Sequence, residues 1–348
     1  MPGVVGGWDW LNRRGCFVCG CAQVYSIPML LVIGWRGEPG RKDEPQHLVQ
    51  GPVTPNLLAS MNIPFEILPD YKEGAEEVLD DAMRTLRTRS SPYALLVKKR
   101  TFAPYKLKAP VTSDHELTRE DFLRVAVDEL GEWDVVVATT GFTSRELYEL
   151  RDEFGHGHER DFLTVGSMGH ASAIAGGIAI AKPSRNVFTL DGDGAVIMHM
   201  GTLSTMGALN LPNFKHVVIN NGAHDSVGGQ PTGGHSVLFT DIAKACGYSL
   251  TITADTEEEI RAGLQALRYV ALGACSLLRR SHALPRSDGV HVVAVYVCVR
   301  VCFLDVCSAH NGPAMLEVRV RPGVRKDLGR PKTTPLQNKD DFQRFLDY

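Results

Sequence analysis

Hydrophobic residues along the chain gather in short, nearly unbroken runs of strand length, separated by segments with helical spacing. Unbroken runs are typical of strands that are covered on both faces, as in parallel sheets. The strands that this pattern predicts are Val24–Trp35, Tyr93–Lys98, Asp134–Ala138, Asn186–Leu190, Lys215–Asn220 and Ala314–Val320. With helices between them, these strands predict an α/β fold with doubly wound, mostly parallel sheets.

Helical segments lie between the predicted strands. Residues 73–88 carry acidic residues early and Arg84 and Arg87 late, which is the charge order that a helix dipole favours. Residues 118–130 open with Thr-Arg-Glu-Asp, the pattern of a capping box. Residues 195–210 and 257–268 complete the set of predicted helices.

Two prolines, Pro104 and Pro110, mark residues 103–115 as a linker between two domains. Residues 24–102 have the pattern of the tail of a βαβ domain, and residues 116–346 that of a mostly parallel α/β domain. The division therefore predicts a partial first domain and a larger second one.

Two segments, residues 1–23 and 269–310, do not fit this alternation, and they hold seven of the eight cysteines. Their cysteine spacing lacks the second close pair or the histidines of a zinc site. Removal of residues 269–310 would join a predicted helix to the last predicted strand by a short connection. We therefore predict that residues 1–23 are unrelated to the rest of the chain and that residues 269–310 are an insertion, in effect a translated intron.

Charge and hydropathy limit the function classes. The net charge is −3, without a basic excess, so nucleic acid is not expected as a partner. The longest apolar runs, Val24–Trp35 and Val290–Leu304, are shorter than the roughly 20 residues of a spanning helix, so no membrane partner is expected. These features indicate a small-molecule enzyme, which we expect in the cytoplasm.

The strongest chemical motif is Gly192-Asp193-Gly194, which follows one predicted strand, while Asn221 follows the next. Parallel strand ends meet at one edge of the sheet, so Asp193 and Asn221 can offer a carboxylate and an amide oxygen to one hard cation such as Mg²⁺. The glycines allow close approach of a diphosphate. A dinucleotide-binding module is disfavoured because Gly166, Gly169, Gly176 and Gly177 lack its spacing.

This spacing resembles the signature of thiamine diphosphate enzymes. The segments GWRGEPGRKDEPQH, TVGSMGHASAIAGGIA, INNGAHDSVGGQPT and RKDLGRPKTTP are similar to the phosphonopyruvate decarboxylase family, over residues 24–268 and 311–346. Sulfopyruvate decarboxylases share much of the pattern. The resemblance implies that residues 24–102 are part of a pyrimidine-binding domain and that residues 116–346 bind diphosphate and Mg²⁺.

The resemblance also implies a set of cofactor contacts. The backbone carbonyl of Ala223 would be the third protein ligand of Mg²⁺, beside Asp193 and Asn221. The carbonyl of Gly166 would accept from the aminopyrimidine, and Met168 would hold thiamine diphosphate in its bent shape. The implied cofactor-binding residues are Thr140, Gly141, Phe142, Thr143, Gly166, Ser167, Met168, Gly192, Asp193, Gly194, Ala195 and Asn221.

The implied reaction is decarboxylation of the 2-oxoacid 3-phosphonopyruvate to phosphonoacetaldehyde and CO₂, in phosphonate biosynthesis, by a homodimer or larger homo-oligomer. The substrate candidates are His47, His170, His224 and Ser226, whose motifs flank the expected cofactor site. Three arginines lie near the same strand ends, but surface ion pairs are the expected use of Arg145, Arg151 and Arg160.

One departure from the family affects the expected activity. The family's cofactor-activating glutamate has no counterpart here, because residues 1–23 contain no glutamate. Loss of a general acid/base group typically costs about 10² to 10⁴ in rate. We therefore expect impaired activity of this chain as written. The alternatives are a sulfopyruvate or other 2-oxoacid decarboxylase, or a non-catalytic fragment that binds thiamine diphosphate.

Overall fold

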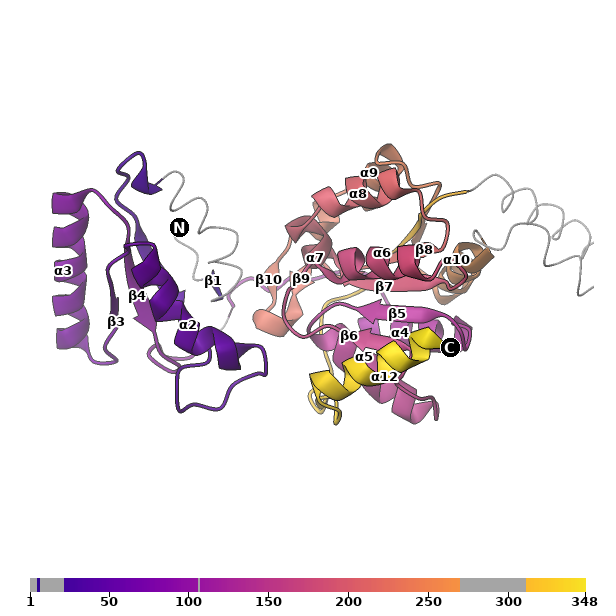
Figure 1. Cartoon of the computed structure of the whole chain (residues 1–348), viewed down its shortest axis with the longest axis horizontal. Helices are drawn as coiled ribbons and strands as arrows, with labels where there is room; N and C mark the ends of the chain where they lie inside the picture. The colour runs from indigo at the N-terminus through magenta and orange to yellow at the C-terminus, as the bar shows by residue number, and fades with distance from the viewer. Residues whose placement is uncertain (1–4, 7–21, 106, 270–310) are drawn as a thin grey trace, which may run out of the picture. The chain divides into compact units, whose positions relative to one another are not determined.

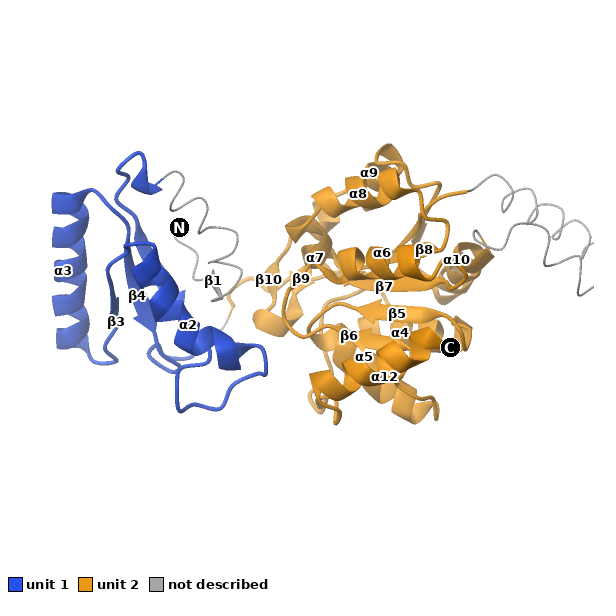
Figure 2. Ribbon diagram, viewed as in Figure 1, with its two compact units in different colours: residues 1–106 blue, residues 107–348 orange. Residues whose placement is uncertain are grey.

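The computed structural model describes residues 5–6, 22–105, 107–269 and 311–348 (Figure 1). The chain divides into two compact units, residues 1–106 and 107–348 (Figure 2). The boundary falls within residues 103–115. Most of the two anomalous segments, with their seven cysteines, lies outside the described residues, so the predictions for them stay predictions.

The first unit contains a four-stranded parallel sheet with the order β1-β2-β4-β3. The predicted strand 24–35 is too long, because the strand begins only at Leu30. Before it, Ser26 has a positive φ of 52°, and the backbone N–H of Ile27 turns back to the carbonyl of Ala22. The strand bounds are Val5–Gly6 for β1, Leu30–Gly34 for β2, Phe65–Ile67 for β3 and Tyr93–Val97 for β4.

Two helices accompany this sheet. Helix α3, Lys72–Arg89, confirms the predicted helix and its charge order. Helix α2, His47–Ser60, was not predicted, because Pro52 and Pro55 lie inside it and proline disfavours helix interiors. The helix forms nonetheless where Gly51 crosses Gly37 so closely that a Cβ on Gly51 would lie 1.5 Å from the Gly37 carbonyl oxygen.

The second unit is built on a six-stranded parallel sheet with the order β11-β12-β8-β7-β5-β6. The four central strands confirm the predicted ones within one or two residues at each end. The edge strands β6 and β11 were missed, because β6 has only three residues and β11 is half-buried and rich in threonine. The bounds are Val135–Ala138 for β5, Asp161–Leu163 for β6, Val187–Gly192 for β7, Phe214–Asn220 for β8, Leu250–Ala254 for β11 and Ala314–Arg319 for β12.

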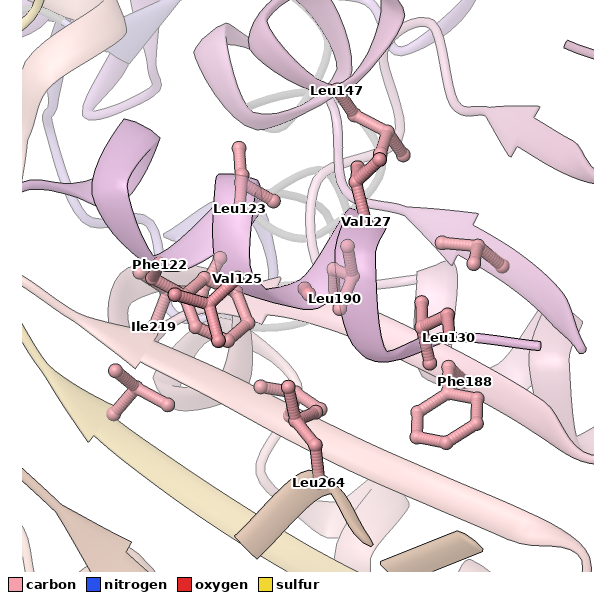
Figure 3. Packing of buried hydrophobic residues seen from close by; sticks show 14 of the residues in the cluster. Phe122, Leu123, Val125, Val127, Leu130, Leu147, Phe188, Leu190, Ile219 and Leu264 are labelled. Atoms are coloured by element: carbon pink, nitrogen blue, oxygen red, sulfur yellow. The ribbon is translucent and has the colours of Figure 1, made fainter. Parts of the chain in front are cut away.

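Helices cover both faces of this sheet, which confirms the doubly wound α/β prediction. On one face, Phe122, Leu147 and Leu264 pack on strand residues such as Leu190 and Ile219 (Figure 3). Full burial of each such side chain stabilises the fold by about 1.5–3 kcal/mol. This face is covered by α4 (Arg119–Glu129), α5 (Phe142–Glu153) and α10 (Glu257–Tyr269). The other is covered by α6 (Ala171–Ala181), α8 (Gly201–Leu209), α9 (Phe239–Ala245) and α12 (Pro335–Asp347).

Two helix predictions had different outcomes. Helix α4 begins after Thr118, and Thr118 and Asp121 form the predicted capping box. The single helix predicted over residues 195–210 is wrong, because it is split into α7, Asp193–Met198, and α8. The break falls at His199, whose backbone leaves the helical region (φ −128°, ψ 42°). Its imidazole lies over Gly169, where an added Cβ would be 2.5 Å from Cδ2 of His199.

The order of the strands places a topological switch point between β5 and β7. The chain leaves β5 toward β6 on one side and returns to β7 on the other. In open α/β sheets, ligands bind in the crevice outside the carboxyl ends of the strands at such a point. Of the helices that the structure describes, none is long and apolar enough to cross a membrane.

Candidate active site

The Gly-Asp-Gly motif lies at the carboxyl end of β7, directly at the switch point. The strand continues through Gly192, two residues beyond the predicted end, and Asp193 begins α7. The Asp193 side chain is buried, with the residue only 2% exposed, and its Oδ2 accepts a hydrogen bond from Thr232 Oγ1. Burial raises the pKa of Asp193, although the Thr232 hydroxyl opposes this shift. A cation beside the carboxylate would stabilise its charged form.

Two neighbouring asparagines at the end of β8 have different surroundings. Asn220 is held by the sheet, since its Nδ2 donates to Glu317 Oε1 at 2.9 Å and to the Gly234 carbonyl at 3.1 Å. Asn221 lies in the following loop and is 5% exposed. Its Nδ2 donates to Asp225 Oδ2 at 2.8 Å, and its Oδ1 accepts from the backbone N–H of Ala223 at 3.1 Å. The amide nitrogen of Asn221 therefore faces Asp225, and its amide oxygen faces the backbone N–H of Ala223 in the same loop.

A third segment closes this region around Asp193. Strand β9, Ala223–His224, pairs with β10, Gln230–Pro231, and the chain then runs through Thr232 to Gly234. A Cβ on Gly234 would lie 2.1 Å from Asp193 Oδ2 and 2.6 Å from Asn220 Oδ1. Only glycine fits where these two oxygens converge. By contrast, a Cβ on Gly192 would meet nothing within 4 Å, so open space adjoins the motif.

The loop after β5 leads into α5 through Gly141, whose φ of 108° is a conformation that strongly favours glycine. Helix α5 has no side-chain cap and no acidic residue in its first turn. The helix is 12 residues long, and the N-terminus of such a helix can bind an anion through its first backbone N–H groups. Ser226 lies opposite, since a Cβ on Gly141 would be 3.2 Å from Ser226 Oγ.

The loop after β6 carries the Gly166-Ser167-Met168-Gly169 motif. Gly166, Ser167 and Gly169 all have positive φ, of 77°, 47° and 84°. Positive φ is uncommon for a residue such as Ser167, so this loop has an unusual backbone shape. The N–H of Gly166 donates to Thr140 Oγ1 at 3.0 Å, which joins the loops after β5 and β6. Met168 is half-buried there.

The structure brings some of the predicted substrate residues to these loops. His224 packs on the motif, since a Cβ on Gly194 would lie 2.5 Å from its Cε1, and Ser226 lies beside Gly141. His170 is exposed after the Gly166 loop and meets His199 edge-on at 4.2 Å between ring centroids. His47 belongs to the first unit, where its Nδ1 lies 2.9 Å from Asp43 Oδ1. The role of His47 at the site therefore stays a prediction.

The predicted surface use of the arginines needs correction. Arg151 is fully buried and forms a two-point ion pair with Asp161, at 2.8 and 2.9 Å. Arg160 is also buried and donates to the Gly131 carbonyl at 3.0 Å. Arg145 lies over the Phe142 ring, 5.8 Å from its centroid. The sequence did not reveal that Arg151 and Arg160 are internal, because a charged residue on an amphipathic helix or in a loop is usually exposed.

Several residues of the site were missed in the sequence. Thr232 and Gly234 contact Asp193, yet the segment Gly228–Gly234 has only the glycine-rich composition of a loop. A buried network was also missed, in which Arg119 binds Glu146 at 2.7 and 2.8 Å and Asp225 at 3.1 Å. Burial works against the charge of Arg119, but the hydrogen bonds and charges of Glu146 and Asp225 hold its pKa above the usual value. No local motif marks these long-range partners.

The residues proposed as metal ligands from the sequence follow β7 and β8 and carry oxygen donors of the types that a hard divalent cation takes. Asp193, Asn221 and Ala223 offer a carboxylate, an amide and a carbonyl oxygen, the ligand types that Mg²⁺ prefers. Within the described part of the chain, no cluster of three His, Cys, Asp or Glu side chains could hold a metal ion.

Comparison with known proteins agrees with this geometry. Residues 154–277 match the family model for the C-terminal thiamine pyrophosphate-binding domain of thiamine pyrophosphate enzymes. The phosphonopyruvate decarboxylase of Streptomyces viridochromogenes is 32% identical over 335 residues, covering 92% of this chain and 73% of that protein. The chain belongs to the phosphonopyruvate decarboxylase family. The family relative from Streptomyces hygroscopicus is also 32% identical, over 92% of this chain and 72% of its own length.

Membership in the phosphonopyruvate decarboxylase family confirms the sequence-based assignment to thiamine diphosphate-dependent carboxy-lyases. A third relative, the β subunit of sulfopyruvate decarboxylase from Methanocaldococcus jannaschii, is 39% identical over 142 residues. That match covers 40% of this chain and 72% of the relative. All three relatives are decarboxylases or a decarboxylase subunit by name, but they differ in substrate, which is phosphonopyruvate for two and sulfopyruvate for the third.

Proposed function

We propose that the chain decarboxylates 3-phosphonopyruvate to phosphonoacetaldehyde and CO₂, with thiamine diphosphate and Mg²⁺ as cofactors. The observation that carries the proposal is the position of the buried Asp193 and of Asn221 after the neighbouring parallel strands β7 and β8, beside the open space at Gly192, in a chain of the phosphonopyruvate decarboxylase family. The phosphonopyruvate decarboxylase of Streptomyces viridochromogenes is 32% identical over 92% of this chain, whereas the sulfopyruvate decarboxylase of Methanosarcina acetivorans is 26% identical over 68%. We therefore propose phosphonopyruvate, and not sulfopyruvate, as the substrate of this chain.

Mg²⁺ would be held by the Asp193 carboxylate, the Asn221 amide oxygen and the Ala223 backbone carbonyl. Mg²⁺ keeps an octahedral shell and usually retains water or takes phosphate oxygens from a cofactor. Three protein ligands leave room for the diphosphate oxygens. The nearly complete burial of Asp193 supports this assignment, because a buried carboxylate is stabilised by a bound cation.

The diphosphate would lie against Thr140, Gly141, Phe142 and Thr143, where helix α5 begins without a side-chain cap. The first N–H groups of the helix and the metal would share the diphosphate charge. Gly192, Gly194 and Ala195 would contact it from the other side of the crevice. Gly166, Ser167 and Met168 would hold the pyrimidine end, since the hydrogen bond from Gly166 to Thr140 joins that loop to the diphosphate loop.

When bound, the cofactor supplies an electron sink for the bond that breaks as CO₂ leaves. The protein's own share is to orient the 2-oxoacid, exclude water and match the phosphonate charge. His224 and Ser226 are the best-placed donors for this task, because they approach Gly194 and Gly141 on opposite sides of the crevice. His170 and His47 are further candidates, and a homodimer or larger homo-oligomer is the proposed assembly.

The experiment is a substrate comparison with the purified full chain. CO₂ release is measured with 3-phosphonopyruvate, sulfopyruvate and pyruvate, with and without thiamine diphosphate and Mg²⁺. The proposal expects cofactor-dependent release that is fastest with 3-phosphonopyruvate, and loss of release in Asp193→Ala. Faster release from sulfopyruvate would favour the second candidate, which the sulfopyruvate decarboxylase match supports. Cofactor binding without CO₂ release would indicate a non-catalytic binding protein.

A further inference from the structure

One half-buried carboxylate, that of Asp225, connects the loops after β8 and β12 to the start of α4, next to the proposed metal site. Its Oδ2 accepts from Asn221 Nδ2 at 2.8 Å, from the backbone N–H of Gly323 at 3.0 Å and from Arg119 Nη1 at 3.1 Å. Asn221 follows β8, Gly323 follows β12, and Arg119 is the first residue of α4. A single oxygen therefore fixes the loops after two neighbouring strands to the start of a helix.

Arg119 is itself fixed on every side. Its guanidinium forms a two-point ion pair with Glu146 on α5, at 2.7 and 2.8 Å, and donates to the Gly323 carbonyl at 3.2 Å. It also lies over the Phe142 ring, 5.5 Å from the centroid, and Phe142 is the first residue of α5 and belongs to the proposed diphosphate-binding segment. Because Arg119 is only 6% exposed, these contacts hold it in one position. Arg119 therefore holds the Asp225 carboxylate in place beside Asn221.

The contact with Asp225 determines which way the Asn221 amide faces. A carboxylate only accepts hydrogen bonds, so it must meet the NH₂ group of Asn221 and not the amide oxygen. The opposite orientation of the amide would place the Asn221 amide oxygen against the Asp225 carboxylate oxygen. The Ala223 N–H donates to Oδ1 in the same orientation, at 3.1 Å, and leaves that oxygen a second lone pair. The amide oxygen is therefore directed away from Asp225 and toward the loop that carries Ala223.

We infer that Asp225, held by Arg119, is a positioning residue that fixes the Asn221 amide with its oxygen available to the metal. This inference rests on the proposed function, in which Asn221 is a metal ligand. Groups behind metal ligands commonly orient them, and loss of such a group typically weakens metal binding by about 10- to 100-fold. Asp225 would act through Asn221 without touching the metal or the substrate.

The test measures the affinity of the full chain for Mg²⁺ at saturating thiamine diphosphate, by isothermal titration calorimetry. Asp225→Ala removes the accepting oxygen and is expected to weaken Mg²⁺ binding by at least about tenfold. Asp225→Asn retains one oxygen that can accept from Asn221 but loses the charge, and is expected to weaken binding by about threefold. If the Mg²⁺ affinity falls more in Asp225→Ala than in Asp225→Asn, the loss follows the loss of the oxygen that orients the amide.

A matched control breaks an ion pair between the same two helices that does not reach Asn221. Arg124 on α4 binds Glu153 on α5 at 2.5 and 3.0 Å at the surface, so Glu153→Gln should leave Mg²⁺ affinity unchanged. Thermal unfolding of the metal-free variants is measured in parallel. A merely structural role would lower the melting temperature of Asp225→Ala while the folded protein bound Mg²⁺ as tightly as before.

The possible outcomes separate the two claims. If the wild-type chain does not bind Mg²⁺ and thiamine diphosphate, the proposed function and this inference both fall. If the wild type binds and Asp225→Ala binds equally well, only the inference is overturned. Should Asp225→Ala not fold, Asp225→Ser tests the same contact, because its hydroxyl is polar yet too short to reach Asn221. Unchanged Mg²⁺ affinity in that variant would also overturn the inference.

Discussion

Gly234 offers a direct test of the proposed metal site, because it limits where the Asp193 carboxylate can lie. In Gly234→Ala, the new Cβ would lie 2.1 Å from Asp193 Oδ2. An ordinary contact between such atoms is about 3.4 Å, so the carboxylate or the loop must move by more than about 1 Å, and close-packed interiors resist such shifts. Mg²⁺ tolerates little departure from octahedral geometry. We expect Mg²⁺ affinity to fall by about 10- to 100-fold, as when the support of a ligand is removed.

The assay is titration of Mg²⁺ into the full chain at saturating thiamine diphosphate, with thermal unfolding of the metal-free protein beside it. Gly177→Ala is the matched control, since a Cβ at that position would meet nothing within 4 Å and lies in helix α6. The control should bind Mg²⁺ like the wild type. If Gly234→Ala bound Mg²⁺ within twofold of the wild type, Asp193 would not be the ligand that the geometry indicates.

Three further predictions concern stability. Asp161→Ala should destabilise the protein by about 3–5 kcal/mol in chemical denaturation, because it leaves the fully buried Arg151 unpaired, whereas Glu153→Gln at the surface should cost less than about 1 kcal/mol. Thr118→Ala should cost about 1 kcal/mol by removing the cap of α4, and Thr118→Ser should restore most of it. The hydrogen bond from Arg36, together with those from His47 and two backbone N–H groups, holds the pKa of Asp43 far below its usual range. A depressed pKa contributes stability above the unfolded-state value of about 3.9 that is lost as pH falls below it, so Asp43→Asn should reduce the loss of stability between pH 5 and pH 2.

Much of the fold could be predicted because local patterns decide it. The central strands of the second unit are continuous apolar runs, and the capping box at Thr118 is a four-residue signal. The failures have tertiary causes. Helix α2 forms despite two internal prolines where Gly51 and Gly37 pack closely, and the helix over residues 195–210 breaks where His199 covers Gly169. These contacts depend on how segments pack in space, and hydrophobic periodicity does not predict them.

In the candidate site, too, some features follow from the local sequence and others depend on residues that are distant in the sequence. Asp193 and Asn221 were predicted as neighbours because parallel strands end at one edge of a sheet, and in the structure they directly follow the neighbouring strands β7 and β8. Their supports are partly distant in sequence, since Thr232 lies 39 residues from Asp193 and Arg119 lies 106 residues from Asp225, whereas Asp225 is only 4 residues from Asn221. Motif spacing can suggest a ligand, but the distant residues that hold its surroundings are chosen by packing.

This division explains why the second of two adjacent asparagines is the one that we propose as a metal ligand. Asn220 is the last residue of β8, and its side chain is used to fasten the sheet to Gly234 and Glu317. Asn221 is one residue further, where the strand has ended and the side chain leaves the sheet, so its amide can turn toward the loop. Its direction is then set by Asp225 on one side and by the Ala223 N–H on the other. The register of β8 against β12 and β7 therefore decides which of the two asparagines ends in the sheet and which lies in the loop.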